Sequence, residues 1–164
     1  MTSKELEFEL YYAVKKNDVE RVKELFKQHG KVDTTIRPYN QSLLLHAVLN
    51  GGKEITEYLV KNGFDVNEPD ANGYRPLHAA AEYGFPKLIM ILANNGADPN
   101  VRDKKGNTPL SVAIFRAKDD LSVVKSLIAA GADAKEKIYD DVDAIGMAKQ
   151  FNNNKLVDYL TSVA

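Results

Sequence analysis

The chain of 164 residues contains no cysteine, and neither sign of charge dominates it. The lack of cysteine excludes a disulfide framework, a thiolate metal site and a cysteine nucleophile. Lysine and arginine total 22 and aspartate and glutamate total 23, which gives a net charge of −1. This balance provides no overall field for holding a polyanion or an acidic membrane surface, so it disfavours nucleic-acid and membrane binding.

Long apolar runs are also missing. Nowhere do about eighteen apolar residues stand together, as a membrane span requires, and residues 1–10 (MTSKELEFEL) alternate charged and apolar side chains. That pattern lacks the apolar core of a secretory signal. The sequence therefore predicts a cytoplasmic protein, and with 44% hydrophobic residues it is long enough for one well-buried domain, 1–164.

What the sequence does contain is a repeat. The segment beginning at Asp70 closes on Gly96-Ala97-Asp98, and a similar segment beginning at Asp103, 33 residues later, closes on Gly131-Ala132-Asp133. The same period extends in both directions and yields five copies. A small residue and a leucine recur in each copy, namely Ala13, Ala47, Ala80, Ala113 and Ala148, and Leu25, Leu59, Leu92, Leu127 and Leu160.

Each copy has the same internal order, which predicts a turn followed by two helices. Asp70 and Gly73 have turn chemistry, because aspartate caps its own backbone and glycine accepts a positive φ. Pro76 and Pro86 suit the first turn of a helix, where a missing N–H does no harm. The glycine of each closing triplet, such as Gly96, suits the position just after a helix. The apolar spacing predicts that one face of each second helix is buried.

Residues 75–80 (RPLHAA) and 108–113 (TPLSVA), together with the Gly-Ala-Asp triplets, resemble the signature of the ankyrin-repeat family over almost the entire chain. The resemblance implies an all-α solenoid of stacked helix-turn-helix units with short β-hairpin-like fingers. Its approximate repeats are 3–33, 37–69, 70–102, 103–137 and 138–164. The first and last of these resemble the degenerate caps of a free-standing stack, because each has one face turned to water.

Three departures from the family pattern are visible. Leu45 stands where the family has histidine, and residues 37–40 lack the usual aspartate and glycine, so we expect an irregular finger there. Two extra residues within 117–120 lengthen the break between the helices of the fourth repeat. His78 does occupy the family's histidine position, which implies a structural ring that bridges adjacent fingers by hydrogen bonds rather than a catalytic or metal-binding group.

Ankyrin repeats bind other proteins through a concave face made of fingers and inner helices, so the resemblance implies a partner protein. The repeat register places eight candidate partner-binding residues on that face, and most are aromatic or cationic, the types enriched at interfaces. An alternative for any one aromatic, such as Tyr74 or Tyr83, is packing against the next repeat. The candidates are Tyr39, Tyr74, Tyr83, Lys104, Lys105, Phe115, Arg116 and Tyr139.

A short basic strip accompanies these residues. Arg102, Lys104, Lys105 and Arg116 lie near one another in the register, with Arg75 beside them. One interpretation is a solvated surface with no partner, and the other is a surface for an acidic partner. The sequence alone leaves both open.

The function expected is a non-catalytic protein-binding module that is monomeric when free and needs no cofactor or metal. Free-standing ankyrin proteins of this size resemble bacterial immunity proteins that neutralise a toxin. A scaffold or regulatory subunit of a larger complex is the alternative. An enzyme or a nucleic-acid binder is less well supported, because the sequence has no nucleophile-and-base pair, no metal cluster, no cofactor loop and no broad basic face.

Overall fold

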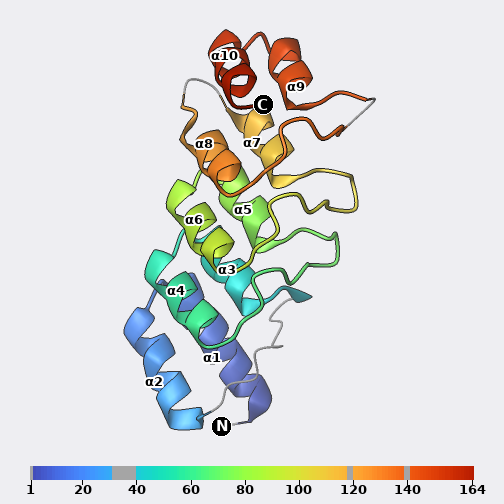
Figure 1. Ribbon diagram of the computed structural model, residues 1–164. Coiled ribbons are helices and arrows are strands. Elements are labelled where there is room, and N and C mark those ends of the chain that lie inside the picture. Colours follow the sequence, from blue (N-terminus) through green and yellow to red (C-terminus); the bar gives the residue numbers. More distant parts are fainter. Residues whose placement is uncertain (1, 31–39, 118–119, 139–140) are drawn as a thin grey trace.

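The computed structural model describes residues 2–30, 40–117, 120–138 and 141–164. In these ranges the chain forms helices that follow one another in antiparallel pairs (Figure 1). The pairs are α1 (Ser3–Lys15) with α2 (Val19–His29), α3 (Leu43–Leu49) with α4 (Lys53–Lys61), α5 (Pro76–Glu82) with α6 (Pro86–Asn94), α7 (Pro109–Arg116) with α8 (Ser122–Ala129), and α9 (Ala144–Gln150) with α10 (Asn154–Val163).

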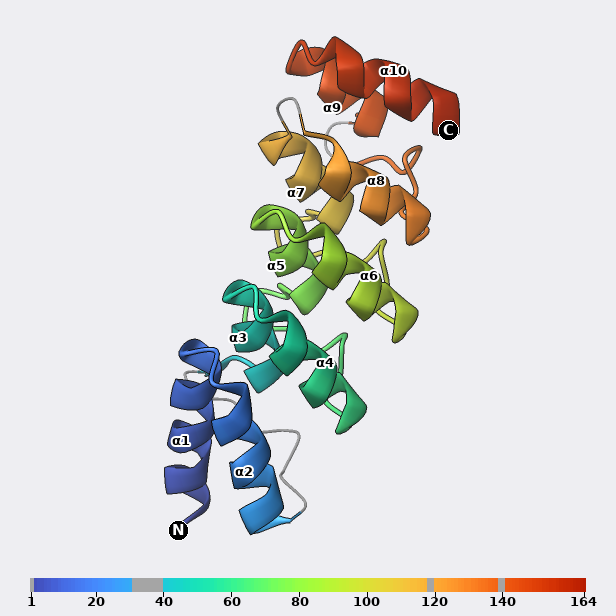
Figure 2. The ribbon, with the colours of Figure 1, turned by 90° about the vertical axis from the view of Figure 1, so that its left-hand side faces the viewer.

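The pairs stack in a single row, with the two chain termini at opposite ends of the stack (Figures 1 and 2). The first helix of each pair, here called the inner helix, lies in one layer, and the second, the outer helix, lies in the other. Each inner helix packs on the inner helix before it and after it; α5, for example, contacts α3, α6 and α7. This arrangement confirms the predicted all-α solenoid. None of the helices in the described part of the chain combines the length and apolar character that crossing a membrane requires.

Helix ends lie where the sequence predicts them. Pro76 and Pro109 occupy the first turn of their inner helices, and Pro86 does so in the outer helix α6. Gly96 and Gly131 follow the outer helices α6 and α8 with φ angles of 89° and 94°, a left-handed conformation that costs little only for glycine. Each glycine thus ends its helix and turns the chain toward the next finger.

The core is one continuous layer between the helices. Ala80 is 0% exposed and lies in α5 between α3 and α7, so a small side chain there allows the inner helices to approach closely. The five periodic leucines of the outer helices are each 0% exposed, which confirms the predicted buried face. Because each helix pair has only its neighbours to pack against, the stack is stabilised mainly at the junctions between repeats.

The departures from the repeat pattern have clear structural outcomes. Leu45, which stands where the family has histidine, is 0% exposed. An apolar side chain is therefore buried at the position of a polar ring. Helix α7 ends at Arg116 and α8 begins at Ser122, whereas α5 ends at Glu82 and α6 begins at Pro86, which confirms the predicted lengthening between the helices. Residues 37–39 of the finger predicted to be irregular lie outside the described residues.

Two asparagines link successive repeats next to the glycines that end the outer helices. The side chain of Asn67 donates to the Gly96 carbonyl (2.8 Å) and accepts from the Asp98 N–H (2.9 Å). Asn100 repeats this one unit later, donating to the Gly131 carbonyl (3.1 Å) and accepting from the Asp133 N–H (2.7 Å). Each amide therefore satisfies one donor and one acceptor of the following repeat.

Replacing Asn100 by alanine is expected to lower the free energy of unfolding by about 1–2 kcal/mol, because two backbone groups lose their partner. Asn100→Asp keeps the acceptor and loses the donor, so its effect should be intermediate. Urea denaturation followed by circular dichroism measures both. Asn94→Ala is the matched control, since Asn94 is exposed at the end of α6. Equal midpoints for Asn100→Ala and Asn94→Ala would show that the amide links contribute nothing.

Candidate functional site

Two of the fingers, here defined as the loops 62–75 and 95–108 that precede α5 and α7, end in nearly identical turns. The Asp70 carboxylate accepts hydrogen bonds from the N–H groups of Asn72 (2.8 Å) and Tyr74 (3.0 Å). The Asp103 carboxylate does the same for Lys105 (2.8 Å) and Asn107 (2.8 Å), and it also accepts from the Asn107 side chain (2.7 Å). The predicted turn chemistry is thus confirmed, and the aspartates are committed to holding the turns.

His78 ties these two fingers together. Its Nδ1 accepts from the Arg75 N–H (3.2 Å), so the proton lies on Nε2, which donates to the Asn107 carbonyl (3.0 Å) in the next repeat. A backbone bond from Lys104 to Asn72 (2.9 Å) joins the tips as well. Burial lowers the pKa of His78, which keeps the ring neutral, and the expected bridging role is confirmed.

In the next repeat a shorter side chain, Ser111, stands at the place of His78. Its hydroxyl bonds within its own repeat to Thr108, accepting from the N–H (3.0 Å) and donating to the carbonyl (2.9 Å), and among the described residues it makes no bridge to the following finger. The fingers 62–75 and 95–108 are therefore held to each other by the His78 hydrogen bond and by the backbone bond between their tips.

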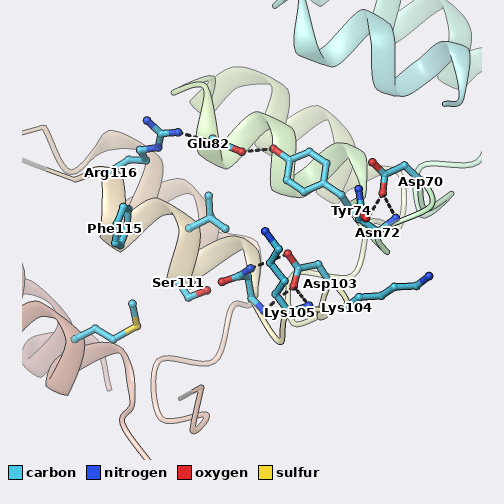
Figure 3. Close-up of a pocket in the computed structure, with 13 residues that line it drawn as sticks. Asp70, Asn72, Tyr74, Glu82, Asp103, Lys104, Lys105, Ser111, Phe115 and Arg116 are labelled. Atoms are coloured by element: carbon cyan, nitrogen blue, oxygen red, sulfur yellow. Dashed lines mark hydrogen bonds and ion pairs between the residues drawn. The ribbon is translucent and has the colours of Figure 1, made fainter. Parts of the chain in front are cut away.

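An open hollow of about 720 Å³ lies against this pair of fingers and the inner helices α5 and α7. We call this side of the molecule, formed by the fingers and the inner helices, the finger face. Figure 3 shows the finger residues on one wall of the hollow and the residues of α7 on another. Five of the eight predicted partner-binding residues line the hollow: Tyr74, Lys104, Lys105, Phe115 and Arg116.

Glu82 joins two of these residues across the hollow. The Tyr74 hydroxyl donates to one carboxylate oxygen of Glu82 (2.7 Å), and the Arg116 guanidinium donates to the other (2.5 Å), as Figure 3 shows. The Tyr74 hydrogen bond, followed by that of Arg116, lowers the pKa of Glu82 despite partial burial. Because Glu82 ends α5 and Arg116 ends α7, this contact fixes the geometry between adjacent repeats.

The expectation that Tyr74 is exposed needs correction. Its ring is half-buried and stacks on His78 with 5.4 Å between ring centroids, and burial raises the pKa of its hydroxyl. Packing against its own repeat and bonding to Glu82 therefore account for much of this side chain, although it still lines the hollow. These contacts of Tyr74 with His78 and Glu82 lie within its own repeat, 70–102, rather than with the next repeat, as the alternative had it.

The most exposed aromatics lie at the ends of the inner helices. Phe115 is 70% exposed and Tyr83 is 55% exposed. Phe151, which follows α9, is 46% exposed and meets Phe115 edge to face with 5.5 Å between ring centroids. Phe151 is not among the eight sequence candidates, although it occupies the same register position as Tyr83, three residues after the periodic alanine. That shared register is the signal that could have identified it.

The basic strip does not form one continuous cationic surface. Arg102 pairs with Glu136 (2.6 Å) in the following finger, and Arg116 pairs with Glu82. Among the described residues, Lys104 and Lys105 are exposed and form no ion pair. Arg75, which the sequence places beside the strip, is half-buried, so the exposed and unpaired cations of the strip are these two lysines.

Two of the eight candidates, Tyr39 and Tyr139, lie outside the described residues. Within the described ranges, no group of three histidine, aspartate or glutamate side chains is placed to hold a metal ion. The carboxylates of the hollow are instead engaged in the finger turns and in the contact with Arg116.

The sequence is similar to known proteins along most of its length. A family model described as ankyrin repeats (3 copies) matches residues 10–103 and 69–138. Protein phosphatase 1 regulatory subunit 27 from Mus musculus is 32% identical over 81 residues, which cover 49% of this chain and 53% of that protein. The aligned segment thus spans about half of the length of that relative.

Two enzymes match over a small part of their own length. A probable serine/threonine-protein kinase from Dictyostelium discoideum is 33% identical over 92 residues, 52% of this chain and 11% of that protein. A glycerophosphocholine phosphodiesterase from Schizosaccharomyces pombe is 32% identical over 139 residues, 84% of this chain and 12% of that protein. Since the family model covers well over half of the chain and the helix pairs stack as its repeats require, this chain belongs to the ankyrin-repeat family.

Proposed function

We propose that this chain is a non-catalytic module that binds another protein through its finger face. Ankyrin repeats are protein-binding repeats, and solenoids of this kind present extended binding surfaces. The observation that carries the proposal is Phe115, which is 70% exposed at the hollow. A large exposed aromatic on a hollowed surface is the type of side chain that dominates binding energy at interfaces.

The polar groups of the hollow support a binding role rather than a catalytic one. Asp70 and Asp103 are committed to their turns, Glu82 to Tyr74 and Arg116, and the Ser111 hydroxyl to Thr108. A general base or nucleophile needs a free lone pair or an activating neighbour in reach of a substrate. These groups serve as fixed walls instead.

One class of candidate partner is an enzyme whose activity a regulatory subunit controls. Similarity to protein phosphatase 1 regulatory subunit 27 makes the catalytic subunit of protein phosphatase 1 a first candidate partner, and this chain would then be a regulatory subunit. A toxin bound by an immunity protein, or a scaffolded complex, is tested by the same experiment, since each requires a partner protein on the finger face.

The test compares capture of binding proteins from an extract of the native host by wild type and by the double variant Tyr83→Ala/Phe115→Ala. An exposed aromatic that acts as a hot spot contributes about 2 kcal/mol, a factor of about 30, so the double variant should bind the recovered partner at least about 30-fold more weakly even when one of the two rings alone is a hot spot. Purified phosphatase catalytic subunit is assayed in parallel by surface plasmon resonance.

The matched control is Lys61→Ala/Lys87→Ala, which changes two exposed side chains on the outer helices α4 and α6. This control should bind as wild type does. If it loses the partner while the finger-face variant keeps it, the partner binds the outer helices and the proposed surface is wrong.

A further inference from the structure

The hollow has a formal charge of zero, but its hydrogen-bonding capacity is not balanced. Three carboxylates line it, those of Asp70, Glu82 and Asp103, and so do three cations. The Asp103 carboxylate already accepts from Lys105 N–H, Asn107 N–H and the Asn107 amide. Burial alone would raise the pKa of Asp103, but these hydrogen bonds together outweigh it and lower the pKa. Little acceptor capacity is left for an arriving cation.

The cations differ from the carboxylates in this respect. Arg116 is held by Glu82, whereas the exposed side chains of Lys104 and Lys105 make no ion pair within the described ranges. Each ammonium group offers three donors and no acceptor. An arriving carboxylate would therefore find free donors, while an arriving lysine or arginine would have to share carboxylates that already hold the fingers or pair with Arg116.

An apolar surface adjoins these lysines. Phe115 and Met147 both line the hollow, and Phe151 packs edge to face on Phe115. Met147 is 7% exposed and belongs to α9, so this part of the hollow is built by two adjacent repeats. Phe115 is 70% exposed and Phe151 is 46% exposed. An aromatic ring or a branched aliphatic side chain of a partner therefore has room to pack on them.

We propose that the hollow binds an acidic segment of a partner protein in which a bulky apolar side chain lies within a few residues of the carboxylates. The apolar side chain packs on Phe115 and Phe151, and the carboxylates accept hydrogen bonds from Lys104 and Lys105. A hollow of about 720 Å³ is within the range of about 300–1,000 Å³ that is typical of ligand-binding clefts. This inference rests on the proposed function and names the partner's chemistry.

The probe is a displayed library of random 12-residue peptides, selected on folded wild-type protein and, in parallel, on Phe115→Ala. Selection on wild type should enrich aspartate or glutamate close to leucine, phenylalanine or tryptophan, and Phe115→Ala should lose that enrichment. Enrichment of basic or uncharged peptides, or no enrichment at all, would overturn the acidic-segment proposal.

A fluorescent copy of the most enriched peptide then measures affinity by anisotropy. Lys104→Glu/Lys105→Glu should weaken binding about tenfold or more, and wild-type affinity should fall as salt rises. Lys61→Glu/Lys87→Glu makes the same charge change on the outer helices and should leave affinity unchanged. Equal weakening by both pairs would reduce the effect to net charge and contradict a specific site.

The outcomes separate this inference from the proposed function. If host-partner capture depends on Tyr83 and Phe115 but no acidic peptide is enriched, the finger face binds by other chemistry and only the inference fails. Analytical ultracentrifugation tests whether a second copy of this chain occupies the hollow. A dimer that Phe115→Ala dissociates would make a second copy of this chain the occupant, which would also overturn the inference.

Discussion

Leu92→Ala is expected to lower the free energy of unfolding by about 3–4 kcal/mol, because it opens a cavity at the junction of repeats. Leu92 is 0% exposed in α6, and α6 packs against α4 on one side and α8 on the other. A solenoid has no other core to compensate, since each repeat contacts only its neighbours. Equilibrium urea denaturation followed by circular dichroism measures the change.

Phe115→Ala is the matched comparison for this prediction. It removes a larger side chain, but one that is 70% exposed, so the free energy of unfolding should change by no more than about 0.5 kcal/mol. Similar losses for the two variants would contradict the assignment of Leu92 to the core and of Phe115 to the surface. A near-neutral result for Phe115→Ala also shows that its binding defects do not arise from unfolding.

His78→Ala should cost about 3 kcal/mol of unfolding free energy. The ring is 0% exposed, and its removal leaves the Arg75 N–H without its acceptor and the Asn107 carbonyl without one of its donors, in addition to a cavity. His78→Leu fills the cavity but restores neither bond, so it should recover only part of the loss. Chemical denaturation at pH 7.5 measures both variants.

Ser111→Ala is the control for His78→Ala, because Ser111 stands at the equivalent position of the next repeat. Ser111 bonds only within its own repeat, so its loss should cost about 1 kcal/mol. If His78→Ala is no more destabilising than Ser111→Ala, the bridge between the fingers adds nothing to stability.

Because of His78, the free energy of unfolding should also depend on pH. Burial lowers the pKa of His78 in the folded state below the usual histidine value of about 6.5. Above that value the ring is neutral in both states, and stability is full. As the pH falls below it, the unfolded chain gains a proton that the folded chain does not, so the free energy of unfolding falls by up to about 1.4 kcal/mol per pH unit. His78→Leu should lack this component, and the difference between the two proteins removes the contributions of His29 and His46.

The repeat pattern predicted the fold because it encodes contacts that recur at a fixed spacing. The positions of Pro76 and Gly96, the buried leucines and the bridging histidine all follow from one unit and its neighbour. Such contacts lie within one repeat or between neighbouring repeats and recur along the chain, so similar residues at equivalent positions have similar environments.

The surface chemistry could not be predicted in the same way. Arg102 and Arg116 look like members of one strip in the sequence, yet they pair with Glu136 and Glu82. Tyr74 looks exposed, yet it stacks on His78 and bonds to Glu82. The partner of a long side chain depends on its rotamer and on which groups lie within reach. Those groups stand at positions whose residue type varies from one repeat to the next.

By itself, the sequence determined the five-unit period, the paired helices with their ends and the buried face of each outer helix, and its resemblance to ankyrin repeats implied the place of the bridging ring. Only the tertiary structure decided that Phe151 joins Phe115, and that two lysines keep their charges unpaired among the described residues beside an open hollow. The physical reason is that burial of apolar faces and helix capping follow from local spacing. The distribution of charge and exposed rings depends instead on where adjacent repeats place their side chains in space.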